Sequence, residues 1–303
     1  MRTLFYLVCL AFVACAGERS TLPHFISLPL TQSAKWNEAI PASKEVPVLR
    51  EIYDHRSPLE DGIVYVDGKK GSKMNEPTGT IAHELTHGIN SYLRETKRDF
   101  SGFYIPYVGA SYLLETSAKR DQMASFIPKE LRGIEGNGGR FYQYVQTASG
   151  SEPDAGTYFD PSTGKKLWGH TNVYYIWDEW NAYINGGRAD LEAEHLFGKQ
   201  KWDSLTGPVE FMVYSLAGLM TIKKYDSAYL RTVHFQEAKD LFMFFSEQTL
   251  KLLAEGQGSS LSPEKANRYL DRLRNSQSAE ARNLRRFLLD EFNPAWVNQF
   301  FGF

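Results

Sequence analysis

The nine residues 82–90, AHELTHGIN, constrain the fold and chemistry of this chain more than any other feature. They contain His83-Glu84-x-x-His87, in which two histidines stand four positions apart and a glutamate directly follows the first. On a helix this spacing places both imidazoles on one face, where they can bind a single metal ion, and the glutamate can take a proton from a metal-bound water. The segment therefore predicts a helix with a catalytic zinc site. The plainer alternative is a surface helix that carries two histidines by coincidence.

The residues around the motif favour an amphipathic helix. At about 100° per residue, one side of this helix is apolar or small, with Ile81, Leu85, Gly88, Ile89 and Tyr92. The opposite side collects His83, His87, Asn90 and Arg94. Thr78 or Thr80 is expected to cap the first turn. The helix is thus expected to bury one stripe and to present both histidines to a cleft.

Residues 82–90 resemble the zinc-binding helix of the thermolysin-like metallopeptidases and, more widely, of the zincins. The resemblance covers this helix only and does not extend over the rest of the chain. It implies that His83 and His87 are zinc ligands and that Glu84 is the general base. It implies nothing about substrate preference.

A catalytic zinc needs a third protein ligand, and the residues that follow His87 offer no further histidine. The best candidate is Glu179, in the segment 172–186, NVYYIWDEWNAYING. Its apolar residues form one helical stripe, with Glu179 flanking the stripe and Asp178 pointing away from it. The alternatives that stay open are Asp178, Glu115, Glu192 and His195.

The string Glu179-x-x-Ala182-Tyr183 resembles the second, glutamate-bearing helix of the gluzincins. That pattern has an asparagine before the glutamate and an aspartate four residues after it, where this chain has Asp178 and Tyr183. The resemblance therefore does not identify which residue orients the metal ligands in this chain. A group that polarises the scissile carbonyl is also needed. Tyr183 is the first choice, and the other candidates are His170, Tyr174, Tyr175 and His234.

The N-terminus reads as an export signal, residues 1–16. Arg2 supplies a positive charge, and an apolar run over residues 4–14 is too short to span a bilayer. Cleavage is expected after Ala16; alternatively, cleavage after Ala14 would leave Cys15 to carry a lipid anchor. Because at most Cys15 survives processing, no disulfide framework is expected, which favours a bacterial periplasm or cell envelope.

Composition and patterning predict a mainly helical α+β fold. The chain has 303 residues and 42% hydrophobic content, so a large core is available. Its net charge of −2 gives no indication of binding to nucleic acid or to an anionic membrane. We expect one zincin-like domain over residues 17–303, with a small sheet and the catalytic part in about 17–200 and a helical part in about 201–303. A monomer is expected.

Several segments have local predictions. Residues 25–30 and 46–52 have β-like composition. Ile63, Val64, Tyr65 and Val66 are expected to form a strand, which either binds substrate backbone by strand addition or is a plain core strand. Residues 112–126 have a helical pattern. Residues 147–170 form a polar loop that is a candidate lid. Helices are predicted over 208–223, 234–253, from Pro263 and over 279–292, with Trp296, Phe300 and Phe301 docking the tail.

These features predict an exported zinc metallopeptidase that acts on a peptide or protein substrate. Two alternatives remain: an envelope binding protein that keeps the zincin shape without turnover, and a zinc amidase that acts on the cell wall.

Overall fold

A computed structural model describes residues 25–26, 46–55, 78–96, 100–106, 110–115, 123–134, 140–148, 158–159, 166–168, 173–199 and 204–303. The export signal with Cys15, the predicted strand Ile63, Val64, Tyr65 and Val66, and most of the candidate lid lie outside these residues. None of the helices in the described part of the chain is both long and apolar enough to cross a membrane.

The described residues form a mainly helical α+β structure, as the sequence predicts. The helices are α2 (Pro47–Asp54), α3 (Thr78–Thr96), α4 (Arg140–Ala148), α5 (Tyr174–Phe197), α6 (Thr206–Tyr225), α7 (His234–Glu255), α8 (Pro263–Asn275), α9 (Ala279–Glu291) and α10 (Pro294–Phe301). The strands are β1 (Phe25–Ile26), β2 (Phe100–Ile105), β3 (Ala110–Glu115), β4 (Tyr158–Phe159) and β5 (Lys166–Trp168). Short 3₁₀ turns cover Met123–Phe126, Lys129–Leu131 and Tyr229–Arg231.

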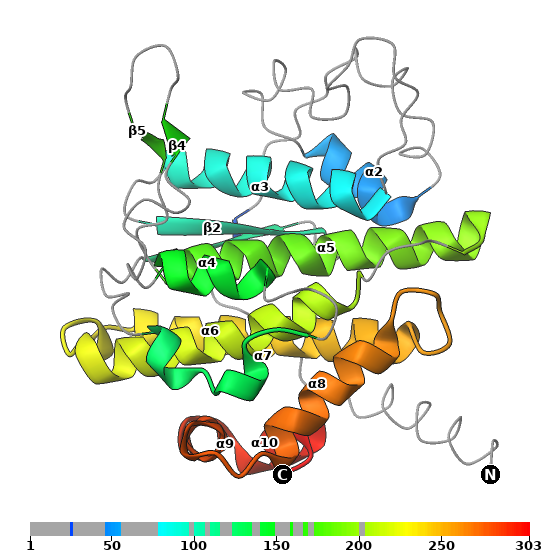
Figure 1. Cartoon of the computed structure of the whole chain (residues 1–303). Helices are drawn as coiled ribbons and strands as arrows, with labels where there is room; N and C mark the ends of the chain where they lie inside the picture. The colour runs from blue at the N-terminus through cyan, green and yellow to red at the C-terminus, as the bar shows by residue number, and fades with distance from the viewer. Residues whose placement is uncertain are drawn as a thin grey trace.

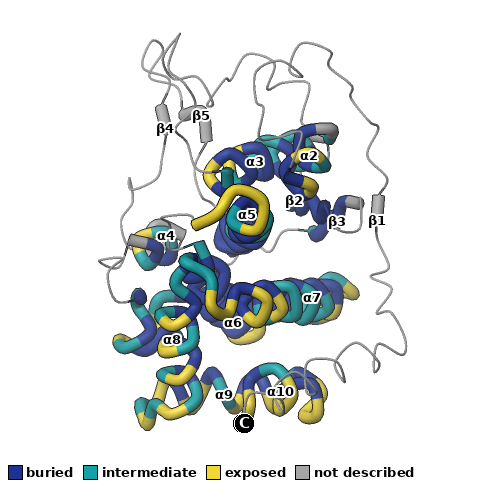
Figure 2. Tube along the Cα trace, turned by 90° about the vertical axis from the view of Figure 1, so that its right-hand side faces the viewer, coloured by how far each residue is buried: buried dark blue, intermediate teal, exposed yellow. Residues whose placement is uncertain are grey.

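The helices are stacked in layers (Figure 1). Helix α3 lies above β2 and α5, α6 and α7 lie below α5, and α9 and α10 form the lowest layer, with α8 running down to them. Helices α5 and α6 are buried along most of their length, whereas α8 to α10 have exposed stretches (Figure 2). A core cluster of buried side chains extends from Phe103 in β2 to Phe301 in α10. Helix α5 is therefore held on several sides at once, which fixes any side chain that it contributes to a site.

The larger sheet is antiparallel in the order β1-β3-β2, with Phe103 opposite Tyr112. At the outer edge of β2, Tyr104 N donates to Asn90 Oδ1 at 2.8 Å, and Asn181 Nδ2 donates to Tyr104 O at 3.0 Å. Because Asn90 is on α3 and Asn181 on α5, these bonds tie both helices to the same strand.

Two local predictions are wrong. Residues 46–52 are largely helical, because Pro47 occupies the first turn of α2 and buried Val48, Leu49 and Ile52 follow helical spacing. The β-branched residues suggested a strand. Residues 112–126 are not one helix: residues 110–115 form β3, in which both faces are buried, so the alternation typical of a strand is missing from the sequence.

The C-terminal helices follow their prediction closely. The expected segments at 208–223, 234–253 and 279–292 correspond to α6, α7 and α9, and α8 begins at Pro263. Trp296 and Phe301 are buried in the additional helix α10, and Phe300 packs against the same core. The sequence was sufficient to predict these helices because each of them is rich in apolar residues that are buried.

The N-terminus of α3 is held by α5. Asp190 Oδ1 accepts a hydrogen bond from Gly79 N at 2.6 Å, and Ser204 donates to the other oxygen of the same carboxylate. Thr78 and Thr80 both lie within the helix, so Thr80 is not its cap. The carboxylate from α5 accepts a hydrogen bond from an amide in the first turn of α3. Its negative charge also interacts favourably with the positive end of the helix dipole.

The two helices approach each other closely at a pair of glycines. A Cβ on Gly186 would lie 2.8 Å from Gly79 O and 3.4 Å from His83 Cβ. Carbon and carbonyl oxygen do not approach to 2.8 Å without repulsion, so a side chain here would push α3 away from α5. The small residues therefore set the distance between the two helices that carry the site described below.

Replacing Gly186 with alanine is expected to lower the free energy of unfolding by about 1–3 kcal/mol, because the methyl group overpacks the contact with α3. Gly218→Ala is the matched control: it also lies inside a helix, but its new Cβ would be 3.6 Å from Met123 Sδ, an ordinary contact. The control is expected to be neutral or to gain up to about 1 kcal/mol. Urea denaturation of both variants measures the difference, and equal stabilities would contradict the close approach.

Candidate metal centre

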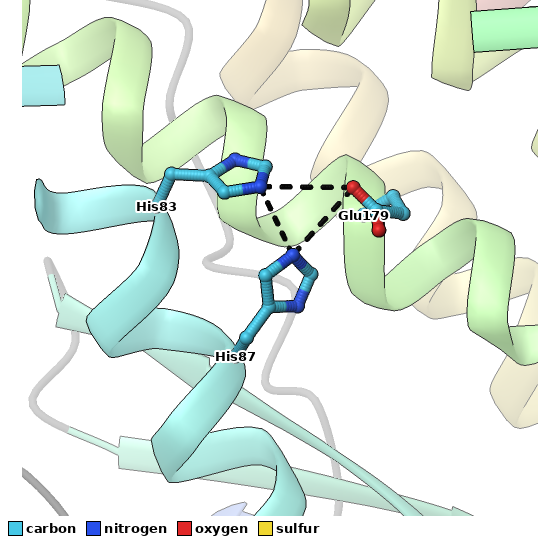
Figure 3. Close-up of side chains that lie close together, drawn as sticks. All are labelled: His83, His87 and Glu179. Atoms are coloured by element: carbon cyan, nitrogen blue, oxygen red, sulfur yellow. Dashed lines mark hydrogen bonds and ion pairs between the residues drawn. The ribbon is translucent and has the colours of Figure 1, made fainter. Parts of the chain in front are cut away.

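Three side chains from two helices converge at one point (Figure 3). His83 and His87 extend from successive turns of α3, and Glu179 faces them from α5. His83 Nε2 and His87 Nε2 are 3.0 Å apart, and Glu179 Oε2 lies 3.7 Å from the first and 3.5 Å from the second. The sequence predicted that Glu179 would meet the two histidines, and the structure brings these three residues together.

The spacing of these atoms suits a metal ion. Ligands held at about 2.0–2.2 Å from a tetrahedral zinc ion lie about 3.3–3.6 Å from one another. The observed separations of 3.0, 3.5 and 3.7 Å bracket that range. Glu179 Oε2 is buried and makes no hydrogen bond among the described residues. A buried carboxylate oxygen that faces two imidazole nitrogens is a donor atom for which a cation is the natural partner, so the group could hold a metal ion.

Asp178 lies behind this group. The sequence placed it away from the apolar stripe of α5, and it is nevertheless buried. Its Oδ2 is 3.1 Å from His87 Nδ1, while its Oδ1 accepts a hydrogen bond from Asn90 Nδ2 at 2.6 Å. Asp178 is buried, since α5 is buried on both of its long faces. The sequence pattern assumed a single buried stripe on this helix, so it did not predict that Asp178 would be buried.

The Asp178 contact determines which nitrogen of His87 faces the site. Because Nδ1 is held by a carboxylate, Nε2 is the nitrogen directed at His83 and Glu179. Asn90 holds Asp178 in turn, and Asn90 is anchored to β2 through Tyr104 N. The residue that orients His87 is thus an aspartate directly before the glutamate.

Charge is balanced across the group. Burial disfavours a charged imidazole, but the carboxylates of Asp178 and Glu179 outweigh burial and hold the pKa of His87 well above its ordinary value. Burial likewise disfavours the two carboxylates, yet His87 keeps the pKa of Asp178 and of Glu179 below their usual range. The carboxylate of Glu179 faces the point where the three donor atoms meet, and the carboxylate of Asp178 lies behind His87, so a cation at that point would be near two buried negative charges.

Glu84 follows His83 on α3, and its side chain is exposed. On the helix it lies about 60° from His87, on the solvent side of the pair. It is not one of the three converging donors.

Tyr183 packs on the first histidine. Its ring centroid is 4.3 Å from that of His83 and 5.1 Å from that of Phe211, with which it stacks. Phe141 of α4 closes a further side at 4.8 Å. The ring thus supports His83 by contact; the proposed role of Tyr183 in polarising a carbonyl stays a prediction.

The remaining candidates have other surroundings. Glu115 pairs with His234, whose other ring nitrogen faces Glu237 at 2.7 Å. Glu192 Oε2 accepts a hydrogen bond from Val48 N at 2.8 Å, and His195 is exposed near the end of α5. Tyr174 is buried against Tyr229, and His170 lies outside the described residues. Of the acids that the sequence offered as third ligand, only Asp178 and Glu179 lie at the histidine pair.

Sequence reasoning also missed a contact of Glu179 with a residue of its own helix. Tyr175 donates a hydrogen bond to Glu179 Oε1 at 2.6 Å. The two residues are four positions apart on α5, and that spacing was the signal that could have found the pair.

Comparison of the chain with protein-family models, with curated proteins and with solved structures found no match.

Proposed function

We propose that this chain is an exported zinc-dependent metallopeptidase of the gluzincin type, with a zincin-like arrangement around its site. The observation that carries the proposal is the convergence of His83 Nε2, His87 Nε2 and Glu179 Oε2 from two helices. Two histidines and one glutamate form a ligand set that catalytic zinc ions use, with a fourth position left for water or substrate.

Zinc is the metal that this donor set favours. Imidazole nitrogen and a single carboxylate oxygen suit Zn²⁺, whereas Mg²⁺ and Ca²⁺ prefer sites built from oxygen alone. The described part of the chain places no cysteine near the group. The buried aspartate behind His87 supplies the outer contact that orients metal-binding histidines.

Bound zinc would supply Lewis acidity, lowering the pKa of a water from 15.7 to about 7 and polarising a peptide carbonyl. The chain's own residues divide the remaining tasks. Glu84 accepts the proton of the attacking water and delivers it to the leaving amine. Asp178 holds His87 in the tautomer whose Nε2 faces the site. Tyr183 packs against His83 and limits rotation of its ring.

Export is inferred from residues 1–16, with a lipid anchor at Cys15 as the alternative to release. Substrate backbone binding by Ile63, Val64, Tyr65 and Val66 is part of the same proposal. The rivals are a zincin-shaped envelope protein without turnover and a zinc amidase of the cell wall. Both would share the histidine pair, so only activity separates them from a peptidase.

The test is hydrolysis by the purified mature protein, assayed in parallel on a peptide library and on peptidoglycan. We expect peptide cleavage that a zinc chelator removes and that added zinc restores. Cleavage of peptidoglycan amides alone would favour the amidase. Stoichiometric zinc without hydrolysis of either substrate would favour the binding protein and contradict the proposed activity.

A further inference from the structure

The two oxygens of the Glu179 carboxylate have different surroundings. Oε1 accepts the hydrogen bond from the Tyr175 hydroxyl group at 2.6 Å, whereas Oε2 faces the two imidazole nitrogens. The carboxylate is buried, so solvent does not compete for either oxygen. One oxygen is thus committed to a neutral donor on its own helix, and the other is directed at the point where the histidines meet.

We propose that Tyr175 is a positioning residue that restricts Glu179 to one metal-binding oxygen. This inference rests on the proposed metal site. A glutamate can bind a metal through one or both oxygens, and a hydrogen bond to one of them makes the two oxygens unequal. Binding through both would make Oε1 serve the metal and the Tyr175 hydroxyl group at once and would weaken a short buried hydrogen bond, which favours binding through Oε2 alone. Binding through one oxygen leaves the fourth position of a tetrahedral ion for water or substrate.

The hydroxyl group of Tyr175 is the donor of this hydrogen bond, because a carboxylate oxygen can only accept. The Tyr175 ring lies 5.9 Å from that of Tyr144 on α4, and Tyr144 contacts Phe211 of α6 at 5.8 Å. Helix α5 places the donor one turn before its acceptor, and the aromatic contacts with α4 hold the ring in place.

The proposed effect of the Tyr175 hydrogen bond is on how Glu179 coordinates the metal. It can therefore be tested by metal binding, without any substrate. Zinc affinity is measured by competition with a chromophoric chelator, and coordination is read from the visible spectrum of the cobalt-substituted protein. A four-coordinate cobalt site absorbs visible light more strongly than a five-coordinate site. The variant is Tyr175→Phe, which removes the hydroxyl group and keeps the ring.

For Tyr175→Phe we expect zinc affinity to fall about 10–100-fold, as is typical when a partner of a metal ligand is removed. The cobalt absorption should weaken, because Glu179 would then bind through both oxygens. Tyr174→Phe is the matched control: it removes a buried tyrosine hydroxyl group from the adjacent position, where it bonds Tyr229 at 2.8 Å. That variant should keep wild-type affinity and spectrum.

Incorporation of 3-fluorotyrosine at position 175 keeps the hydroxyl group and is expected to keep the wild-type cobalt spectrum. Wild-type affinity and an unchanged spectrum in Tyr175→Phe would overturn the inference and leave the proposed function standing. So would an equal loss of affinity in Tyr174→Phe, since that would show a general effect of removing a hydroxyl group. Absence of zinc and cobalt binding in the wild-type protein would overturn the proposed function itself.

Discussion

Glu84→Gln is expected to abolish peptide hydrolysis while the zinc ion stays bound. Glutamine has nearly the same shape but cannot accept the proton of an attacking water. General acid–base catalysis contributes about 10²–10⁴-fold to the rate, so kcat should fall by at least that factor. Because Glu84 is exposed and is not one of the three converging donors, zinc content should remain one ion per chain. Steady-state kinetics together with metal analysis of the purified variant measure both effects.

Glu280→Gln is a suitable control, since this exposed glutamate lies in the first turn of α9, in the lowest layer of the fold. It should keep wild-type kcat. Full hydrolytic activity in Glu84→Gln would show that the proposed base is wrong, even if zinc is present.

Glu179→Ala is expected to remove stoichiometric zinc. The substitution deletes the oxygen that closes the triangle with the two imidazoles. Affinity should fall by more than about 100-fold, the upper end of what loss of an outer contact costs. His83→Ala should have the same effect, and both variants should lose hydrolysis together with the metal. Competition with a chromophoric chelator provides the affinities.

Glu192→Ala provides the comparison on the same helix. Glu192 was a rival for third ligand, and its carboxylate instead accepts a hydrogen bond from the first turn of α2. This variant should bind zinc as tightly as wild type. If Glu192→Ala loses zinc and Glu179→Ala keeps it, the ligand assignment is reversed.

The parts of this structure that could be predicted from the sequence are those that depend on local pattern. The i, i+4 spacing places His83 and His87 on one face of α3 whatever surrounds the helix. Helices α7 and α9 carry apolar stripes that periodicity detects, and α6 is apolar along most of its length, which indicates a buried helix. Glu179 was found because the residues around it have the pattern of a buried helix.

The missed parts depend on how distant segments pack. The contact of Asp178 with His87 requires α5 to be buried on two faces, and no single-stripe pattern predicts that. Residues 112–115 form a strand because Tyr112 pairs with Phe103 of the preceding strand and with Phe25, which is distant in the sequence. The hydrogen bond from Gly79 to Asp190 spans 111 positions, so local capping rules pointed to the threonines instead.

The same packing strengthens the case for a metal site at His83 and His87, although the spacing of two histidines is by itself a weakly specific motif. Histidines with this spacing occur on ordinary surface helices. Here the close approach of Gly79 and Gly186 brings α5 against α3, and the Asn90 and Asn181 side chains fix both helices to β2. A buried glutamate then faces the pair, and a buried aspartate lies behind His87. Burial of two carboxylates is costly unless cations or hydrogen bonds compensate it, which favours a site over coincidence.

A crystal structure of the zinc-loaded protein tests the central claim most directly. It should show one ion within about 2.0–2.2 Å of His83 Nε2, His87 Nε2 and Glu179 Oε2, with one further position taken by water. An ion bound elsewhere, or a Glu179 carboxylate turned away from the two imidazoles while zinc is present, would contradict it.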